Sequence, residues 1–191
     1  EDLRYIYFQE SPLNKMPKPN QELSEWIDII DDADFISMGI GELLEIAAQK
    51  FPNTEALNYS HQPDIKNICW TYKDLNEMST NLARGFLTAG FSPGDTIAVW
   101  GPNHPEWILI EYALAKAGLK LATLNPLYKE KELIFALNTS KVSGIMHADE
   151  IGGVEAITLI QSILCDVPSL DHIYSFTDGI ENLIAQGKAS S

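Results

Sequence analysis

The feature of this sequence that most constrains its fold is a regular alternation of strand-like and helical segments between residues 96 and 176. The apolar, strand-like runs are Thr96–Trp100, Lys120–Leu124, Gly144–His147 and residues 171–176. Segments with helical spacing of apolar residues fill the intervals, at about residues 105–117, 130–137 and 154–164. Such alternation is typical of parallel strands joined by helical crossovers. The sequence therefore predicts an α/β fold with a doubly wound, mostly parallel sheet.

Local signals at helix ends and turns support this prediction. Thr71 is expected to cap a helix that begins after it, with Asp74 at the third helical position completing a reciprocal capping box. The helix presents an apolar stripe through Leu75, Met78, Leu82, Phe86 and Ala89. Gly90 is placed to end this helix in the left-handed conformation. The following Ser92-Pro93-Gly94-Asp95 has the residues that a type II turn requires, and this turn leads into the first parallel strand.

The segments before this helix carry weaker patterns. Residues 1–35 mix aromatic, acidic and helix-breaking residues, which predicts an irregular amino-terminal arm with one short helix near residues 23–30 that packs on the domain. A helix over residues 40–51 would place Leu43, Leu44, Ala47 and Phe51 on one face. Residues 55–59 and 67–70 predict a small β-hairpin.

The carboxyl-terminal segment is expected to be a truncated tail. It has one short helical pattern, at residues 180–185, and its last six residues are small and polar, as in a linker. The predicted organisation is an amino-terminal arm at 1–35, a partial amino-terminal α/β domain at 36–178 and a truncated tail at 179–191.

Charge and composition exclude several classes of partner. The chain has 27 acidic and 13 basic residues, a net charge of −14. A surface this acidic repels phosphate backbones and anionic lipid, so nucleic acid is not expected as a partner. No run reaches the roughly 20 apolar residues of a transmembrane helix. Two cysteines without metal or redox spacing favour an intracellular, reduced environment, and the chain starts without methionine, so the true amino terminus is expected to be missing.

Candidate ligand positions lie where the predicted strands end. In an open α/β sheet, ligands bind beyond the carboxyl ends of the strands, which directs attention to residues 101–104, 125–128 and 147–150. His104, at a helix start, and the cluster His147-Ala148-Asp149-Glu150 are the acid–base candidates, each weighed against the simpler interpretation of a solvated loop or strand end. The four histidines, His61, His104, His147 and His172, lack metal-ligand spacing. No phosphate-binding glycine motif, nucleophile elbow or reactive cysteine context is present. The sequence therefore assigns no catalytic, cofactor-binding or metal-binding residue.

Two motifs carry a resemblance to a known family. The run Trp70-Thr71-Tyr72-Lys73-Asp74-Leu75 resembles the first core motif of the AMP-forming acyl-CoA synthetases, and residues 114–126, with Lys116-Ala117-Gly118 and Asn125-Pro126, resemble the second. Gly94-Asp95, Asn103 with Glu106-Trp107, and Tyr128 with Glu132-Leu133 also fall where that family places such residues. The resemblance covers about residues 40–176 and is greatest to the medium-chain fatty-acid branch of the adenylate-forming ligases.

The resemblance implies an amino-terminal part of a fatty acid–CoA ligase. Enzymes of this family join a fatty acid to coenzyme A, using ATP and Mg²⁺ and releasing AMP and pyrophosphate. Their Ser/Thr/Gly-rich phosphate loop ending in Lys, and their catalytic Lys on a mobile carboxy-terminal domain, have no match in these 191 residues. This chain alone is therefore expected to need no cofactor and to be inactive, since it would end just before the phosphate loop. The resemblance also suggests a mitochondrial location.

Two alternatives stay open at this point. The chain could be a non-catalytic binding or regulatory module derived from such a ligase, associating with another chain through the unfinished edge of its sheet. It could also be an unrelated flavodoxin-like or dinucleotide-binding domain, although the glycine fingerprint of the latter is missing.

Overall fold

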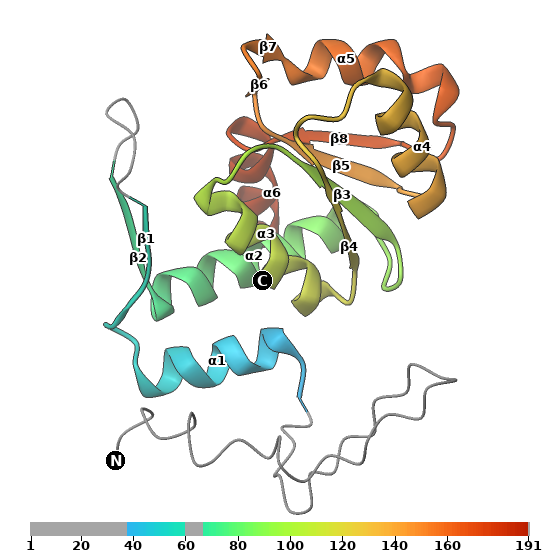
Figure 1. The fold of residues 1–191 in the computed structure, drawn as a ribbon. Coiled ribbons are helices and arrows are strands. Elements are labelled where there is room, and N and C mark those ends of the chain that lie inside the picture. Colours follow the sequence, from blue (N-terminus) through green and yellow to red (C-terminus); the bar gives the residue numbers. More distant parts are fainter. Residues whose placement is uncertain (1–37, 60–66, 191) are drawn as a thin grey trace, which may run out of the picture. The chain divides into compact units, whose positions relative to one another are not determined.

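A four-stranded parallel sheet lies at the centre of the structure, a computed structural model that describes residues 38–59 and 67–190 (Figure 1). Its strands are β3 (Thr96–Trp100), β4 (Lys120–Leu124), β5 (Gly144–His147) and β8 (His172–Ser175), in the order β4-β3-β5-β8. The chain places β4 on one side of β3 and then returns to place β5 on the other. This order confirms the predicted doubly wound sheet. The predicted arm and its short helix lie outside the described residues.

Helices cover both faces of this sheet. On one face lie α2 (Tyr72–Thr88), α3 (Pro105–Ala117) and α6 (Asp178–Ala189), and on the other lie α4 (Glu130–Ser140) and the shorter α5 (Ala156–Ser162), which is followed by the 3₁₀ turn η3 (Leu164–Asp166) (Figure 1). Alternate residues of β3 point to opposite faces. Ile97 and Val99 join the core under α2, α3 and α6, and Ala98 and Trp100 join the core under α4 and α5. The uniformly apolar β3 is explained by this burial on both faces.

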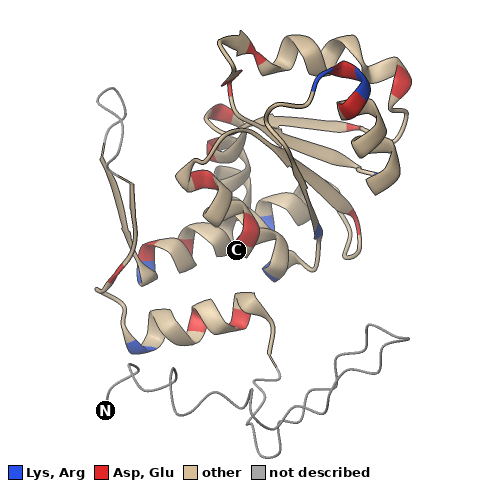
Figure 2. Cartoon of the chain, in the orientation of Figure 1, with Lys and Arg blue, Asp and Glu red and all other residues tan. Residues whose placement is uncertain are grey.

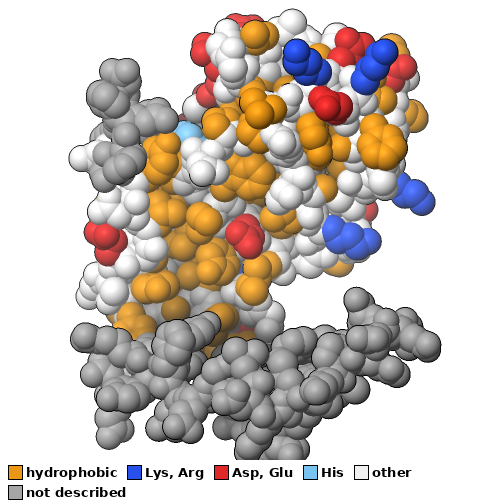
Figure 3. All heavy atoms as spheres, viewed as in Figure 1, with side chains coloured by type: hydrophobic (Ala, Val, Ile, Leu, Met, Phe, Trp, Pro, Cys, Tyr) orange, Lys and Arg blue, Asp and Glu red, His pale blue; other side chains and the backbone are white. Residues whose placement is uncertain are grey.

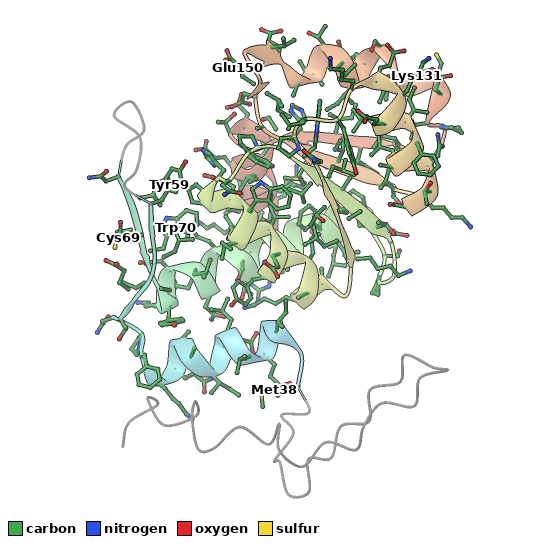
Figure 4. The ribbon with its side chains drawn as sticks, viewed as in Figure 1. Met38, Tyr59, Cys69, Trp70, Lys131 and Glu150 are labelled. Atoms are coloured by element: carbon green, nitrogen blue, oxygen red, sulfur yellow. The ribbon has the colours of Figure 1, made fainter. Side chains whose placement is uncertain are left out.

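Smaller elements complete the described structure. Helix α1 (Ile40–Lys50) packs on α2 and α3, and β1 (Glu55–Tyr59) and β2 (Ile68–Thr71) form the predicted antiparallel hairpin. Strands β6 (Glu150–Ile151) and β7 (Val154–Glu155) form a second, very short hairpin. In Figure 4, Tyr59 and Trp70 lie on the side of the first hairpin that faces the helices, and Cys69 lies on the opposite side.

The predicted caps and turns are confirmed. The Asp74 N–H donates to the Thr71 hydroxyl at 3.2 Å and the Asp74 carboxylate accepts the Thr71 N–H at 3.0 Å, so both halves of the capping box form. Gly90 has a φ of 102° at the end of α2. In the turn before β3, Gly94 has a φ of 96° and the Asp95 N–H donates to the Ser92 carbonyl at 3.0 Å, which is the hydrogen bond of a type II turn.

Two local predictions were wrong in part: the buried face of the helix over residues 40–51, and the start of the helix expected at about residue 154. Helix α1 buries Gly41, Leu44 and Ala48 and leaves Leu43 and Phe51 more than two-fifths exposed, because small residues set its approach to α3. Gly152-Gly153 forms the turn of the β6–β7 hairpin, and the helix starts only at Ala156.

The carboxyl-terminal segment differs most from its prediction. The expected short helix at residues 180–185 is the twelve-residue α6, which extends through most of the linker-like residues. Ile180 and Leu183 are buried in the core that α6 shares with α2, and Gly187 lies at the crossing of α6 with α2. Contacts with α2 therefore order a segment whose composition favours a linker.

Candidate functional site

A cleft of about 700 Å³ opens at the carboxyl ends of β3 and β4, lined almost entirely by apolar surface. Its floor is Trp100, the last residue of β3, which is 2% exposed. One wall is the loop from β4 into α4, and the other is formed by the β6–β7 hairpin and α5. This is the sheet edge at which ligands bind in open α/β folds, and two of the three ligand positions expected from the sequence, 101–104 and 125–128, contribute to it.

Asn125 holds the floor and the first wall together. Its backbone carbonyl accepts the indole N–H of Trp100 at 3.1 Å and the N–H of Tyr128 at 3.0 Å. Its side-chain oxygen accepts the N–H of Leu127 at 2.9 Å. These bonds fold the loop back over the sheet edge, so that Pro126, Leu127 and Tyr128 line the cleft.

The opposite wall depends on two glycines. Gly152 and Gly153 have φ values of 62° and 78°, a conformation that side chains adopt only with strain, and they reverse the chain between β6 and β7. The reversal places Ile151 and Val154 on the cleft, followed by Ala156 and Leu159 from α5. Leu127 and Val154 are 81% and 61% exposed.

Apolar side chains are visible around this region of the surface, over the loop that enters α4 (Figure 3). Charged residues are confined to the rim, where Lys129, Glu130 and Glu155 line the cleft. Figure 2 shows basic residues at the start of α4 and acidic residues at β6 and β7. Lys131 and Glu150 mark these two regions in Figure 4. The site as a whole combines an uncharged interior with a rim of mixed charge.

A second, more polar hollow of about 650 Å³ lies beside it, at the ends of β5 and β8, and includes the acid–base cluster expected from the sequence. His147 is 4% exposed and its Nδ1 lies 2.9 Å from the Ala148 carbonyl. The Asp149 carboxylate accepts the Thr177 hydroxyl at 3.1 Å. No group of three or more His, Cys, Asp or Glu side chains among the described residues is arranged to hold a metal. The bond between Asp149 and Thr177 links the segments that follow β5 and β8.

His104 lies between β3 and α3, where its Nδ1 contacts the Glu106 carboxylate. Its ring packs 5.9 Å from the rings of both Tyr59 and Phe176. Burial lowers the pKa of His104, and the nearby Asp149 carboxylate opposes this shift. Of the other histidines, His172 packs on Phe91 and Tyr174, and His61 lies outside the described residues. The structure therefore brings His104 close to Asp149 but not into the apolar cleft.

The described sheet edge does not fit the phosphates of ATP. The space in which a side chain at Gly101, the glycine that follows β3, would lie is filled, because a Cβ there would be 2.9 Å from the Ala148 side chain and 3.0 Å from Phe176. The neighbouring hollow carries the carboxylates of Asp149, Glu150, Glu155 and Asp178, which disfavour a polyanion.

Comparison with known proteins identifies the family. Residues 44–188 match the family described as "AMP-binding enzyme". The chain belongs to this family. The match spans the motifs at residues 70–75 and 114–126, and the resemblance to AMP-forming acyl-CoA synthetases is confirmed.

Relatives and solved structures agree with this assignment. The chain is 37% identical over 115 residues to the mitochondrial medium-chain acyl-CoA ligase ACSF2 of Rattus norvegicus. The matched residues are 60% of this chain and 18% of that protein. The corresponding zebrafish (Danio rerio) protein is 32% identical over 110 residues, 58% of this chain and 18% of its own length. The chain thus spans less than a fifth of either relative. A long-chain-fatty-acid-CoA ligase from Archaeoglobus fulgidus shares the fold, with a TM-score of 0.71 at 18% identity over 87% of this chain and 33% of that structure. A fatty acyl CoA synthetase from Mycobacterium tuberculosis gives 0.65 at 21% identity over 77% of this chain and 28% of that structure.

The cleft was not found as a site by sequence reasoning. Its lining comes from three segments that are distant in sequence, and the only signal was the general position of the strand ends. Of the residues that shape it most, Asn125 was noted only as part of a family motif, and Gly152-Gly153 lie just before a segment expected to be helical.

Proposed function

We propose that this chain forms the first α/β part of an AMP-forming fatty acid–CoA ligase, whose whole reaction converts fatty acid, ATP and coenzyme A to acyl-CoA, AMP and pyrophosphate. The observation that carries the proposal is the family match over residues 44–188 together with the parallel sheet order β4-β3-β5-β8. The names of the relatives, which are acyl-CoA ligases, support fatty acid as the substrate class.

Within such an enzyme, the described residues act as scaffold and as one wall of a binding region. The poor fit of the sheet edge to a triphosphate means that ATP, Mg²⁺ and the nucleotide of coenzyme A would be held by other parts of the ligase. We therefore propose that the 191 residues alone do not catalyse adenylate formation.

A chimera tests this function directly. Residues 44–188 would replace the matched segment of the rat ligase, and ATP–pyrophosphate exchange with octanoate would be measured. We expect exchange by the chimera, no exchange by the isolated chain, and none by a rat ligase from which the segment is deleted. A chimera that folds and binds ATP but does not support exchange would contradict the proposal, as would clear turnover by the isolated chain.

Location and association are finer proposals. The names of the rat and zebrafish ligases describe them as mitochondrial, which supports a mitochondrial location, to be checked by fractionating cells that express the tagged full-length protein. No helix among the described residues combines the length and hydropathy needed to cross a bilayer. In the described part of the chain β4 pairs only with β3, so its outer edge offers unpaired backbone groups to another chain. Light scattering that shows only monomer at high concentration would exclude association through this edge.

A further inference from the structure

We infer that the polar hollow at the carboxyl ends of β5 and β8 binds an organic cation with several N–H donors, of the guanidinium or primary ammonium class. The inference goes beyond the proposed function, which gives this hollow no role. Three observations carry it, namely the charge of the lining, one buried histidine and the spacing of the carboxylates.

The lining of the hollow is acidic and holds no compensating cation. Its charged residues are Asp149, Glu150, Glu155 and Asp178, and neither Lys nor Arg lines it. Within the described part of the chain, the carboxylates of Glu150, Glu155 and Asp178 have no hydrogen bond or ion pair. Like charges gathered in one hollow repel one another, so a cation that binds there also relieves this repulsion.

One buried histidine offers an acceptor to the same hollow. His147 lines the hollow and is only 4% exposed. Its Nδ1 lies 2.9 Å from the Ala148 carbonyl, which can only accept, so Nδ1 carries the proton and Nε2 of the neutral ring keeps its lone pair. Nε2 has no partner among the described residues. A buried acceptor beside carboxylates is matched by a ligand with N–H donors, and not by a cation whose charge is covered by methyl groups.

The carboxylates are spread too widely for a single metal ion. They come from the segment after β5, from the β6–β7 hairpin and from the start of α6, and no group of three or more among the described residues is arranged to hold a metal. A metal ion requires its ligand atoms at about 2.0–2.6 Å. A guanidinium group instead carries five N–H donors across a planar fork, so it can bond to acceptors that lie farther apart. The spacing therefore favours a polyatomic cation.

The remaining lining suits a small organic molecule. Ile157 and Ile173 contribute apolar surface beside the carboxylates, against which the carbon stem of a ligand can pack. The volume of about 650 Å³ lies within the range of small-molecule sites, roughly 300–1,000 Å³. The hollow therefore accommodates a guanidinium group together with a short alkyl stem.

The test is an NMR titration of the isotope-labelled 191-residue chain with methylguanidine and tetramethylammonium at constant ionic strength. Both probes carry a single positive charge, but only methylguanidine has N–H donors. We expect methylguanidine to bind with a Kd on the order of 1 mM, as two charge-assisted hydrogen bonds would give, and tetramethylammonium to bind at least about tenfold more weakly. Methylguanidine should shift the Nε2 resonance of His147 and the amide resonances of residues 147–155 and 175–178. Equal Kd values, or the absence of shifts at these residues, would overturn the inference.

Two variants and a matched control locate the binding. Glu150→Gln and Asp178→Asn each remove one charge from the hollow and keep the shape of the side chain. Glu111→Gln removes the same charge from an exposed position on α3, outside the lining. We expect each hollow variant to weaken methylguanidine binding by about three- to tenfold, and the control to leave the Kd unchanged. An equal effect of Glu111→Gln would reveal only the general attraction of an acidic chain for cations and would refute the assignment.

Two sources can supply this chemistry, a free small molecule or a basic side chain from the remainder of the ligase. Repeating the titration with the rat-ligase chimera distinguishes them. Binding to the chimera indicates a free ligand, whereas binding to the isolated chain alone indicates that a side chain of the ligase occupies the hollow. Either result upholds the cation site, and neither depends on whether the chimera supports exchange.

Discussion

Replacing Gly187 with alanine should destabilise the protein, although alanine favours a helix more than glycine does. Gly187 lies where α6 crosses α2, and a Cβ at this position would overlap the Asn81 carbonyl and lie 2.8 Å from the Gly85 backbone nitrogen. A Cβ at Gly85 would in turn overlap the Leu183 carbonyl. Both obstacles are backbone atoms, so no side-chain rotation can relieve the overlap and the two helices must separate.

The magnitude follows from what the separation loosens. Leu82, Phe86 and Leu183, at this crossing, are all 0% exposed. If the two helices move apart by about 0.5–1 Å, the facing atoms lose roughly a quarter to a half of their dispersion attraction. Overpacking a core costs typically about 1–3 kcal/mol, and here the upper end applies, while the gain in helix propensity offsets at most about 1 kcal/mol. We therefore expect a net loss of about 2 kcal/mol, a fall in Tm of about 4–8 °C.

Thermal and urea unfolding, followed by far-UV circular dichroism, would measure this loss. Gly39→Ala is the matched control, because Gly39 has a φ of −74° and nothing lies within 4 Å of a Cβ there. The double variant Gly85→Ala/Gly187→Ala should lose less than the sum of the single variants, because helices already separated by one methyl group partly accommodate the second. A Gly187→Ala protein as stable as the Gly39→Ala control would refute the close-crossing argument.

Three further changes test other parts of the scaffold. Lys116→Met should lower the free energy of unfolding by about 1–3 kcal/mol, as measured by urea titration. The Lys116 side chain is 8% exposed, and its ammonium donates to the Asn76 side-chain oxygen on α2 at 2.6 Å. The substitution leaves this acceptor without a partner. Asp74→Asn should cost about 1 kcal/mol at neutral pH through the lost capping box. Hydrogen bonds from Thr71 lower the pKa of Asp74 in the folded protein. The stabilisation by the Asp74 carboxylate is therefore fully present above the ordinary aspartate pKa and is lost as the pH falls through the lowered pKa. The difference in Tm between Asp74→Asn and wild type should vanish over the same pH range. Lys141→Gly should raise Tm slightly, because Lys141 has a φ of 50°, where glycine avoids about 1 kcal/mol of strain.

The parts of the fold that sequence reasoning predicted are those fixed by neighbours in the chain. The capping box joins Thr71 and Asp74, and the turn before β3 depends on Pro93 and Gly94. Each involves residues within four positions of one another, so the residue types at these positions are enough to predict the local structure. The apolar strands could also be predicted from the sequence, because a strand buried on both faces must be apolar throughout.

The parts that could not be predicted depend on contacts distant in sequence. Gly187 and its flanking polar residues have the composition of a linker, and only the carbonyl of Asn81, more than a hundred residues earlier, explains why glycine is needed. The buried face of α1 was misjudged for the same reason. Gly41 is buried because α3 passes close to it, so that a Cβ there would lie 2.8 Å from the Lys116 side chain. The sequence of α1 does not reveal this close approach.

The candidate site shows how a scaffold motif can also shape a binding surface. In the motif that ends with Asn125-Pro126, Lys116 ties α3 to α2, and Gly118, with a φ of 70°, ends α3. These roles are structural. Asn125 differs, because the same backbone carbonyl that fixes the loop also removes the only polar group of Trp100 from the cleft.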